Sequence, residues 1–275
     1  MKATSMNRID QKFRQLKAGK KKALSAYLTA GFPVLSATER LIPELESSGA
    51  DFFEIGFPFS DPIADGPTIQ KSSAEALRGG LTWKKLLAMV SRIRKISQAP
   101  LILMTYSNAL YCRGWKKSID QIAAAGFDGA ILPDMVPEES AELRRLFHRK
   151  GLHLIYLLAP TSSPDRIREV CRESSGFIYC VSVTGVTGSR AALPVSEIKS
   201  FLTRVKRRSR LPVLLGFGIS KPGHIKEFKG LADGFIIGSA LIKALDGKRS
   251  LSSLMDRAKN FITPFDKILS ASKAR

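Results

Sequence analysis

Two carboxylates, Glu54 and Asp65, are the residues of this chain whose type and setting most clearly permit chemistry. Glu54 lies within the apolar run 51–57 (DFFEIGF), and Asp65 follows in a loop rich in proline and glycine. Burial of an unpaired carboxylate disfavours its charged form and raises its pKa towards values that are useful for proton transfer. The pair therefore indicates general acid–base catalysis.

Each carboxylate also has a structural interpretation. Glu54 could form an ion pair with a lysine or arginine, but no basic residue stands at the end of another apolar run. Asp65 precedes Gly66, and Asp61 precedes a proline, which are ordinary turn sequences. Taken alone, Asp65 is equally compatible with a turn and with catalysis.

Other catalytic classes find little support in the sequence. A Schiff-base aldolase needs a lysine in or at the end of a strand, and the apolar runs contain none. The three histidines, His148, His153 and His224, are scattered, so no metal site is predicted. No Ser-His-Asp pattern is present. Proton transfer by Glu54, supported by Asp65, is the remaining option.

The elements that must position these residues alternate regularly along the chain. Short apolar runs predict strands, and amphipathic stretches between them, several opened by Ser, Thr, Asp or Pro, predict helices. The predicted strands span 24–29, 51–57, 100–105, 127–132, 153–159, 177–183, 212–216 and 234–238. The predicted helices span 36–49, 72–97, 115–125, 138–150, 164–174, 195–207, 222–229 and 240–262.

Eight βα units predict an α/β fold, a single (β/α)8 TIM barrel over residues 1–275. An open doubly wound sheet usually carries a glycine-rich first turn, whereas the first strand here leads into TAGFP. We expect an extra N-terminal helix within residues 1–20 to cap the bottom of the barrel, and a frayed tail from about residue 266 to 275.

Glycines gather after the last three predicted strands, where such barrels place their chemistry. These loops are VTGVTGSRAALP (183–194), GFGIS (216–220) and GS (238–239), the last opening a helix. Glycine lets the backbone approach an anion, and the first N–H groups of a helix are free to bind it. The last two loops therefore predict a phosphate site, although glycines after strands also serve as turns.

The composition limits the remaining options. The chain has 275 residues and a formal charge of +20, but its lysines and arginines fall in scattered groups beside helical patterns, without a nucleic-acid motif. We interpret these groups as solvated helix faces and expect no nucleic-acid partner. No run of about 18 apolar residues and no signal peptide is apparent, so we expect no membrane association and a cytoplasmic location.

The segment PFSDPIADGPTIQ (58–70), together with E-x-G-x-P-F beginning at Glu54, resembles the signature of the tryptophan synthase alpha chain family. The resemblance continues through LTAGFP (28–33), LPDMVPEES (132–140), GVTGSR (185–190) and GFGIS (216–220), in the expected order. It covers nearly the whole chain, from about residue 10 to 265.

The resemblance implies a lyase of tryptophan biosynthesis that cleaves indole-3-glycerol phosphate to indole and glyceraldehyde 3-phosphate. Glu54 would carry out the proton transfers, and Asp65 would accept the hydrogen bond from the indole N–H. Tyr179 would lie beside the substrate, unless it is only a core aromatic. The phosphate-binding and substrate-binding residues would be Thr187, Gly188, Gly216, Gly218, Gly238 and Ser239. The indole slot would hold Tyr27, Met104, Ile131, Leu157 and Phe217, each of which could equally be barrel core.

The resemblance also implies a partner. Members of the family pair with a beta chain that carries pyridoxal phosphate, in an alpha2beta2 heterotetramer, and no cofactor is expected in this chain. Loops 57–66 and 183–194 would couple the two chains, with Asp61, Pro62, Asn108 and Asp134 near the interface.

Some features depart from the family's pattern, and two other functions remain open. The charge of +20 is unusual, and Tyr27 and Pro133 stand where Phe or a small residue is expected, which would narrow the indole slot. The alternatives are another phosphate-binding barrel of the same pathway, such as indoleglycerol-phosphate synthase, and a non-catalytic activator of the beta chain. The former would need a lysine acid at a strand end, which is not found.

Overall fold

The computed structural model describes residues 6–182, 194–216, 218–247 and 250–270. Its strands form one parallel sheet in the order β5-β4-β3-β2-β1-β9-β8-β7-β6. Their bounds are β1 (Ala23–Thr29), β2 (Phe52–Gly56), β3 (Leu101–Met104), β4 (Gly129–Ile131), β5 (His153–Ile155), β6 (Leu157–Leu158), β7 (Ile178–Val181), β8 (Val213–Gly216) and β9 (Gly234–Ile237). The two ends of this order, β5 and β6, are separated in the chain by Tyr156 alone, so the sheet closes into a barrel.

The interruption at Tyr156 divides the fifth predicted strand into two. The Tyr156 backbone N–H donates to the hydroxyl of Ser174 at 3.2 Å instead of to a neighbouring strand. β5 pairs with β4, and β6 pairs with β7. The eight predicted strands therefore correspond to the strands of the barrel, and the predicted (β/α)8 architecture is confirmed.

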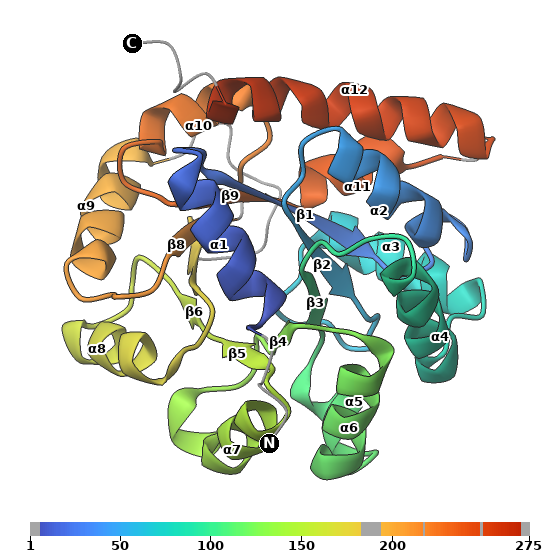
Figure 1. Ribbon diagram of the computed structural model, residues 1–275, viewed down its shortest axis with the longest axis horizontal. Helices are drawn as coiled ribbons and strands as arrows, with labels where there is room; N and C mark the ends of the chain where they lie inside the picture. Colours follow the sequence, from blue (N-terminus) through green and yellow to red (C-terminus); the bar gives the residue numbers. More distant parts are fainter. Residues whose placement is uncertain (1–5, 183–193, 217, 248–249, 271–275) are drawn as a thin grey trace.

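Helices surround the barrel (Figure 1). They are α1 (Arg8–Ala18), α2 (Ala37–Ser47), α3 (Pro67–Arg78), α4 (Trp83–Arg94), α5 (Ser107–Tyr111), α6 (Trp115–Ala125), the 3-10 helix η1 (Pro137–Glu139), α7 (Ala141–Arg149), α8 (Pro164–Glu173), α9 (Val195–Lys206), α10 (Pro222–Phe228), α11 (Ser239–Leu245) and α12 (Leu251–Ser270). In the part of the chain that the structure describes, none of them is both long and apolar enough to cross a membrane.

Two of the predicted helices are wrong in extent. The single helix expected over 72–97 is two helices, α3 and α4, because Gly80 adopts a φ of 79° between them and the Thr82 side chain caps the second. The helix expected over 240–262 is likewise divided into α11 and α12, near Gly247 with a φ of 107°. Residues 266–270, expected to be frayed, continue α12 because Leu269 is buried.

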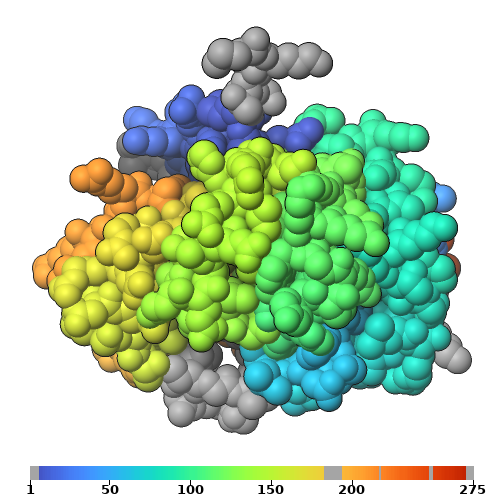
Figure 2. Space-filling model, turned by 90° about the horizontal axis from the view of Figure 1, so that it is seen from below, coloured from blue at the N-terminus to red at the C-terminus, as the bar shows by residue number. Residues whose placement is uncertain are grey.

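The N-terminal helix α1 lies across one end of the barrel, as its blue ribbon in Figure 1 and the blue atoms along the upper edge of Figure 2 show. Its Phe13 ring lies 4.7 Å from that of Phe52, at the start of β2, and 6.0 Å from that of Phe177, just before β7. These contacts are made at the amino ends of the strands. Helix α1 therefore closes the bottom of the barrel and leaves the carboxyl ends for chemistry.

Alternation along β2 determines where its carboxylate points. Phe52 contacts rings inside the barrel, so Glu54 and Gly56 also face the interior, while Phe53 and Ile55 face the helices. All five residues are buried. A glutamate is thereby held inside the barrel, towards the end of a strand.

Candidate active site

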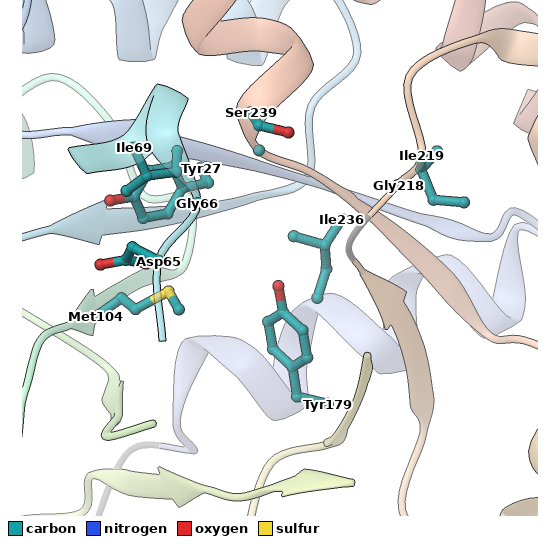
Figure 3. A pocket seen from close by; sticks show the side chains of 11 residues that line it. Tyr27, Asp65, Gly66, Ile69, Met104, Tyr179, Gly218, Ile219, Ile236 and Ser239 are labelled. Carbon is teal, nitrogen blue, oxygen red and sulfur yellow. The ribbon is translucent and has the colours of Figure 1, made fainter. Parts of the chain in front are cut away.

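A small cavity of about 40 Å³ opens at the carboxyl ends of the strands. In Figure 3, Tyr27, Asp65 and Met104 lie on one side of it and Gly218 and Ile219 on the other, while Ser239 lies between them and the Tyr179 hydroxyl points towards the same space. The lining is completed by Gly66, Ile69, Ile236 and Gly238. The volume holds roughly three water molecules.

Glu54 is fully buried beneath this cavity without lining it. The Ser25 hydroxyl donates to Oε1 at 2.8 Å, and no described residue forms a hydrogen bond with Oε2. Burial raises the pKa of Glu54 to about 8, and the bond from Ser25 only partly opposes that shift. Among the described residues no lysine or arginine pairs with Glu54, so the ion-pair interpretation finds no support.

Asp65 lies in the loop between β2 and α3. The turn is made by the backbone, with the Asp65 N–H donating to the Pro62 carbonyl at 3.1 Å. The side chain is free to act elsewhere, and its Oδ2 accepts from the Tyr106 hydroxyl at 3.2 Å. Burial raises the pKa of Asp65 to about 6, against the lowering effect of that bond. Turn chemistry alone therefore does not account for the position of this carboxylate.

The Tyr106 hydroxyl also accepts the N–H of Ala64 at 2.8 Å. Its ring stacks on Phe59 at 5.2 Å. Tyr106 therefore holds both the backbone and the carboxylate of the loop after β2. No motif in the sequence pointed to Tyr106 or to Ser25, because each of their contacts joins segments that are far apart in the chain.

Tyr27 and Tyr179 are each close enough to both carboxylates to feel their charge. Burial raises the pKa of each phenol, and the charges of Glu54 and Asp65 raise both further, so the two carboxylates act on one region of the barrel. Both tyrosines line the cavity. We therefore expect neutral phenols beside any bound ligand.

Each of these tyrosines lies against a glycine of the next strand. A Cβ atom on Gly56 would lie 2.2 Å from the Tyr27 hydroxyl oxygen, and one on Gly216 would lie 2.6 Å from that of Tyr179. Gly216, predicted to contact phosphate, does not line the cavity. Its position against Tyr179 gives it a different reason to be glycine: it leaves room for the ring.

The predicted phosphate end is partly present. Gly218, with a φ of 77°, lines the cavity together with Gly238 and Ser239, where α11 begins. The first N–H groups of a helix have no partner within it, so this edge can bind an anion. Thr187, Gly188 and Phe217, and most of the loop 183–194, lie outside the described residues.

The predicted apolar slot is brought together only in part. Tyr27 and Met104 line the cavity, whereas Ile131 is fully buried, Leu157 is half-buried, and neither lines it. Three residues that the sequence did not single out also line it, namely Ile69, Ile219 and Ile236. Ile69 and Ile219 fall inside the segments PFSDPIADGPTIQ and GFGIS, so the motifs contained the signal.

Comparison with known proteins agrees with this geometry. The model of the family described as "Tryptophan synthase alpha chain" matches residues 13–269. The alpha chain of Geotalea daltonii is 47% identical over 241 residues, which cover 88% of this chain and 91% of that one. That of Citrifermentans bemidjiense is 45% identical over 258 residues, with 94% and 96% coverage.

A solved structure of the alpha subunit from Legionella pneumophila superposes with a TM-score of 0.88 at 35% identity. The match covers 97% of this chain and 100% of that one. The matched sequence, the closed barrel and the motifs around Glu54 and Asp65 thus agree, and the chain belongs to the tryptophan synthase alpha chain family.

Proposed function

We propose that this chain cleaves indole-3-glycerol phosphate to indole and glyceraldehyde 3-phosphate, with Glu54 as proton donor and acceptor and Asp65 as partner of the indole nitrogen. The observation that carries this proposal is the pair of carboxylates at one end of the barrel, Glu54 fully buried and Asp65 half-buried, with pKa values raised to about 8 and about 6. Glycines and a helix start lie across the cavity, where a phosphate would bind.

The reaction requires one proton to be delivered and one to be removed. Protonated Glu54 adds its proton to indole C3, which places a positive charge on the ring nitrogen, and ionised Asp65 stabilises that charge through the N–H. The Glu54 carboxylate then accepts the proton of the side-chain hydroxyl. The carbon–carbon bond breaks, its electrons restore the aromatic ring, and glyceraldehyde 3-phosphate is released with Glu54 protonated again.

Two movements must accompany substrate binding. The cavity of about 40 Å³ is smaller than an indole ring, so side chains such as Tyr27 and Met104 must move aside. Glu54 must turn from Ser25 towards the cavity. Within the described part of the chain, the bond from Ser25 is the one hydrogen bond of the Glu54 carboxyl that this rotation breaks.

The Glu54→Gln variant tests the assignment. The amide keeps the size of the side chain but supplies no transferable proton, so we expect indole release to fall by about 100-fold or more. Indole formation is measured with purified chain, with and without a beta chain, and circular dichroism confirms folding. Substantial indole release by a folded Glu54→Gln variant would refute the role of Glu54.

The beta partner, its pyridoxal phosphate and the alpha2beta2 stoichiometry form part of the same proposal. Loops after neighbouring strands of the barrel expose Asp61, Asn108 and Asp134. Ile63 on the first of these loops is 83% exposed, and Tyr111 is 65% exposed. These loops follow the carboxyl ends of the strands, where the resemblance places the contacts with a beta chain, and Ile63 is the exposed apolar side chain there that a partner could cover. The chain itself needs no cofactor for the proposed chemistry, and a cytoplasmic location remains a prediction.

A matched pair of variants tests this surface. Ile63→Ser should weaken complex formation with a beta chain in size-exclusion chromatography with light scattering. Ile96→Ser is the control, because Ile96 is 66% exposed just before β3, at the opposite end of the barrel. Equal binding by both variants would place the interface elsewhere.

The alternative enzyme of the same pathway lacks support. None of the strands β1 to β9 contains a lysine, which an indoleglycerol-phosphate synthase would need as its acid. A non-catalytic activator would not require a carboxylate buried without an ion pair. The indole assay with Glu54→Gln also distinguishes this second case, because an inactive wild-type chain would support it.

A further inference from the structure

A second hollow lies at the opposite end of the barrel from the candidate active site. Its volume is about 560 Å³, and it lies where β1, β8 and β9 begin. We call it the basal groove. It is lined by Phe13, Arg14, Leu16, Lys17, Lys20, Lys21, Lys22, Lys206, Ser209, Arg210, Leu211, Pro212 and Asp233.

The basal groove brings together charges that are far apart in the sequence. Lys20 and Arg210 belong to two basic groups, at 20–22 and 204–210, that lie far apart in the sequence, yet both residues line this groove. Helix α1 contributes one wall, and the segment between α9 and β8 contributes the other. Seven of the lining residues are basic and one, Asp233, is acidic.

Local ion pairs neutralise only part of this charge. Lys206 pairs with Asp233 at 2.6 Å, Lys22 approaches the same carboxylate at 3.7 Å, and Lys21 pairs with Asp51 and Asp266. Within the described ranges, no ion pair is made by Arg14, Lys17, Lys20 or Arg210, all of which are exposed. A helix C-terminus favours Lys17, at the end of α1, but this does not account for the other three.

The backbone at Lys20 adds an independent observation. Among the described residues, Lys20 is the only non-glycine with a positive φ, at 53°. Glycine adopts this conformation freely, whereas another residue is held there at a cost of roughly 1 kcal/mol. The next N–H, that of Lys21, is fixed by the Leu16 carbonyl at 2.9 Å. The chain thus places a lysine, rather than glycine, at a strained turn that lines the groove.

We propose that the basal groove binds a linear chain of phosphates, such as inorganic polyphosphate, through Arg14, Lys17, Lys20 and Arg210. Cations on two walls of one groove can contact several negative charges of such a chain at once. A single-stranded nucleic acid would also present phosphates, but proteins that bind one usually offer aromatic faces on which its bases stack. The lining aromatic residue, Phe13, is already packed against Phe52 and Phe177.

The binding site is tested by titrating the full chain with inorganic polyphosphate in a calorimeter at several salt concentrations. Four contacts predict that log K falls against log[salt] with a slope of about −3. Lys20→Gly should weaken binding roughly fivefold and reduce the slope by about 1. Because glycine relieves the backbone strain, the variant should melt no lower than the wild type.

A double variant provides the matched control. The test variant combines Lys17→Ala with Lys20→Gly. The control variant combines Lys116→Ala with Lys117→Ala, which removes the same charge from α6, outside the groove. Only the first pair should lose binding, and indole release should be unaffected in both. Equal losses would show a diffuse attraction to the whole charge and overturn the proposal. Tighter binding of a uridine oligonucleotide with as many phosphates would also overturn it, in favour of RNA.

Discussion

Glu54 and Asp65 differ in protonation near neutral pH, although both pKa values are raised by burial. The pKa of Glu54 is about 8 and that of Asp65 about 6, so at pH 7 the first is mostly protonated and the second mostly ionised. When their environments separate the pKa values of two carboxyl groups in this way, one group can act as the acid and the other as the acceptor. Glu54 is buried more completely, and Asp65 receives the bond from Tyr106.

The rate of indole release should therefore depend on pH in a bell shape. We expect kcat/KM to fall below about pH 6 as Asp65 gains a proton, and above about pH 8 as Glu54 loses one. A pH series of initial rates measures both limbs. A profile that is flat from pH 5 to 9 would contradict the assigned protonation states.

The Tyr106→Phe variant separates Asp65 from the substrate phosphate, which also titrates near pH 6. Loss of the hydroxyl removes the bond that lowers the pKa of Asp65. The acidic limb of kcat/KM should therefore move to higher pH, while the alkaline limb stays in place. An unchanged acidic limb would assign it to the phosphate instead of to Asp65.

At the candidate site, a tyrosine on one strand packs against a glycine on the neighbouring strand in two places. Tyr27 on β1 lies against Gly56 on β2, and Tyr179 on β7 lies against Gly216 on β8. Both glycines lie at the carboxyl ends of their strands. The absence of a side chain on one strand thus sets the position of an aromatic ring on the next, which forms part of the cavity wall.

Gly56→Ala should disturb this packing. The added Cβ would lie 2.2 Å from the Tyr27 hydroxyl oxygen, so the ring must shift, and we expect a loss of about 1–3 kcal/mol in the free energy of unfolding, with a raised KM. Gly223→Ala in α10 is the control, because its Cβ would meet no atom within 4 Å. Denaturant unfolding of both variants measures the difference. Equal stability would show that Tyr27 is loosely held.

The free energy of unfolding of the whole molecule should depend on pH through the titration of Glu54. A carboxyl whose pKa rises from 4.5 to about 8 on folding stabilises the fold fully below pH 4.5, and this contribution is lost as the pH rises through 8. In Glu54→Gln the side chain does not titrate, so the free energy of unfolding does not lose this contribution as the pH rises. Between pH 5 and 8, its free energy of unfolding should therefore rise relative to that of the wild type by a few kcal/mol.

Urea unfolding at pH 5, 6.5 and 8 measures this difference for both proteins. Asp65 titrates in both and cancels in the comparison. Parallel pH profiles of the two proteins would mean that Glu54 has an ordinary pKa in the folded chain, and would remove the basis for its role as an acid.

The boundaries of elements show where sequence reasoning was sufficient. Apolar runs such as LILM and VLLG are long enough to define strands, since both faces of a parallel barrel strand are buried. The breaks near Gly80 and Gly247 escaped prediction because amphipathic patterns continue on both sides. Glycine at both breaks and Thr82 before α4 are local signals of helix ends, and the φ values of 79° and 107° at Gly80 and Gly247 agree with them.

The sequence by itself determined the alternating strands and helices, the closed barrel and the two carboxylates, because periodicity and local motifs are written in consecutive residues. Tertiary structure alone decided that Ser25 and Tyr106 contact these carboxylates, that Gly216 accommodates Tyr179, and that distant basic groups line one groove. These facts depend on side chains that meet across the barrel. Such contacts follow from the register and closure of the sheet, which no single segment encodes.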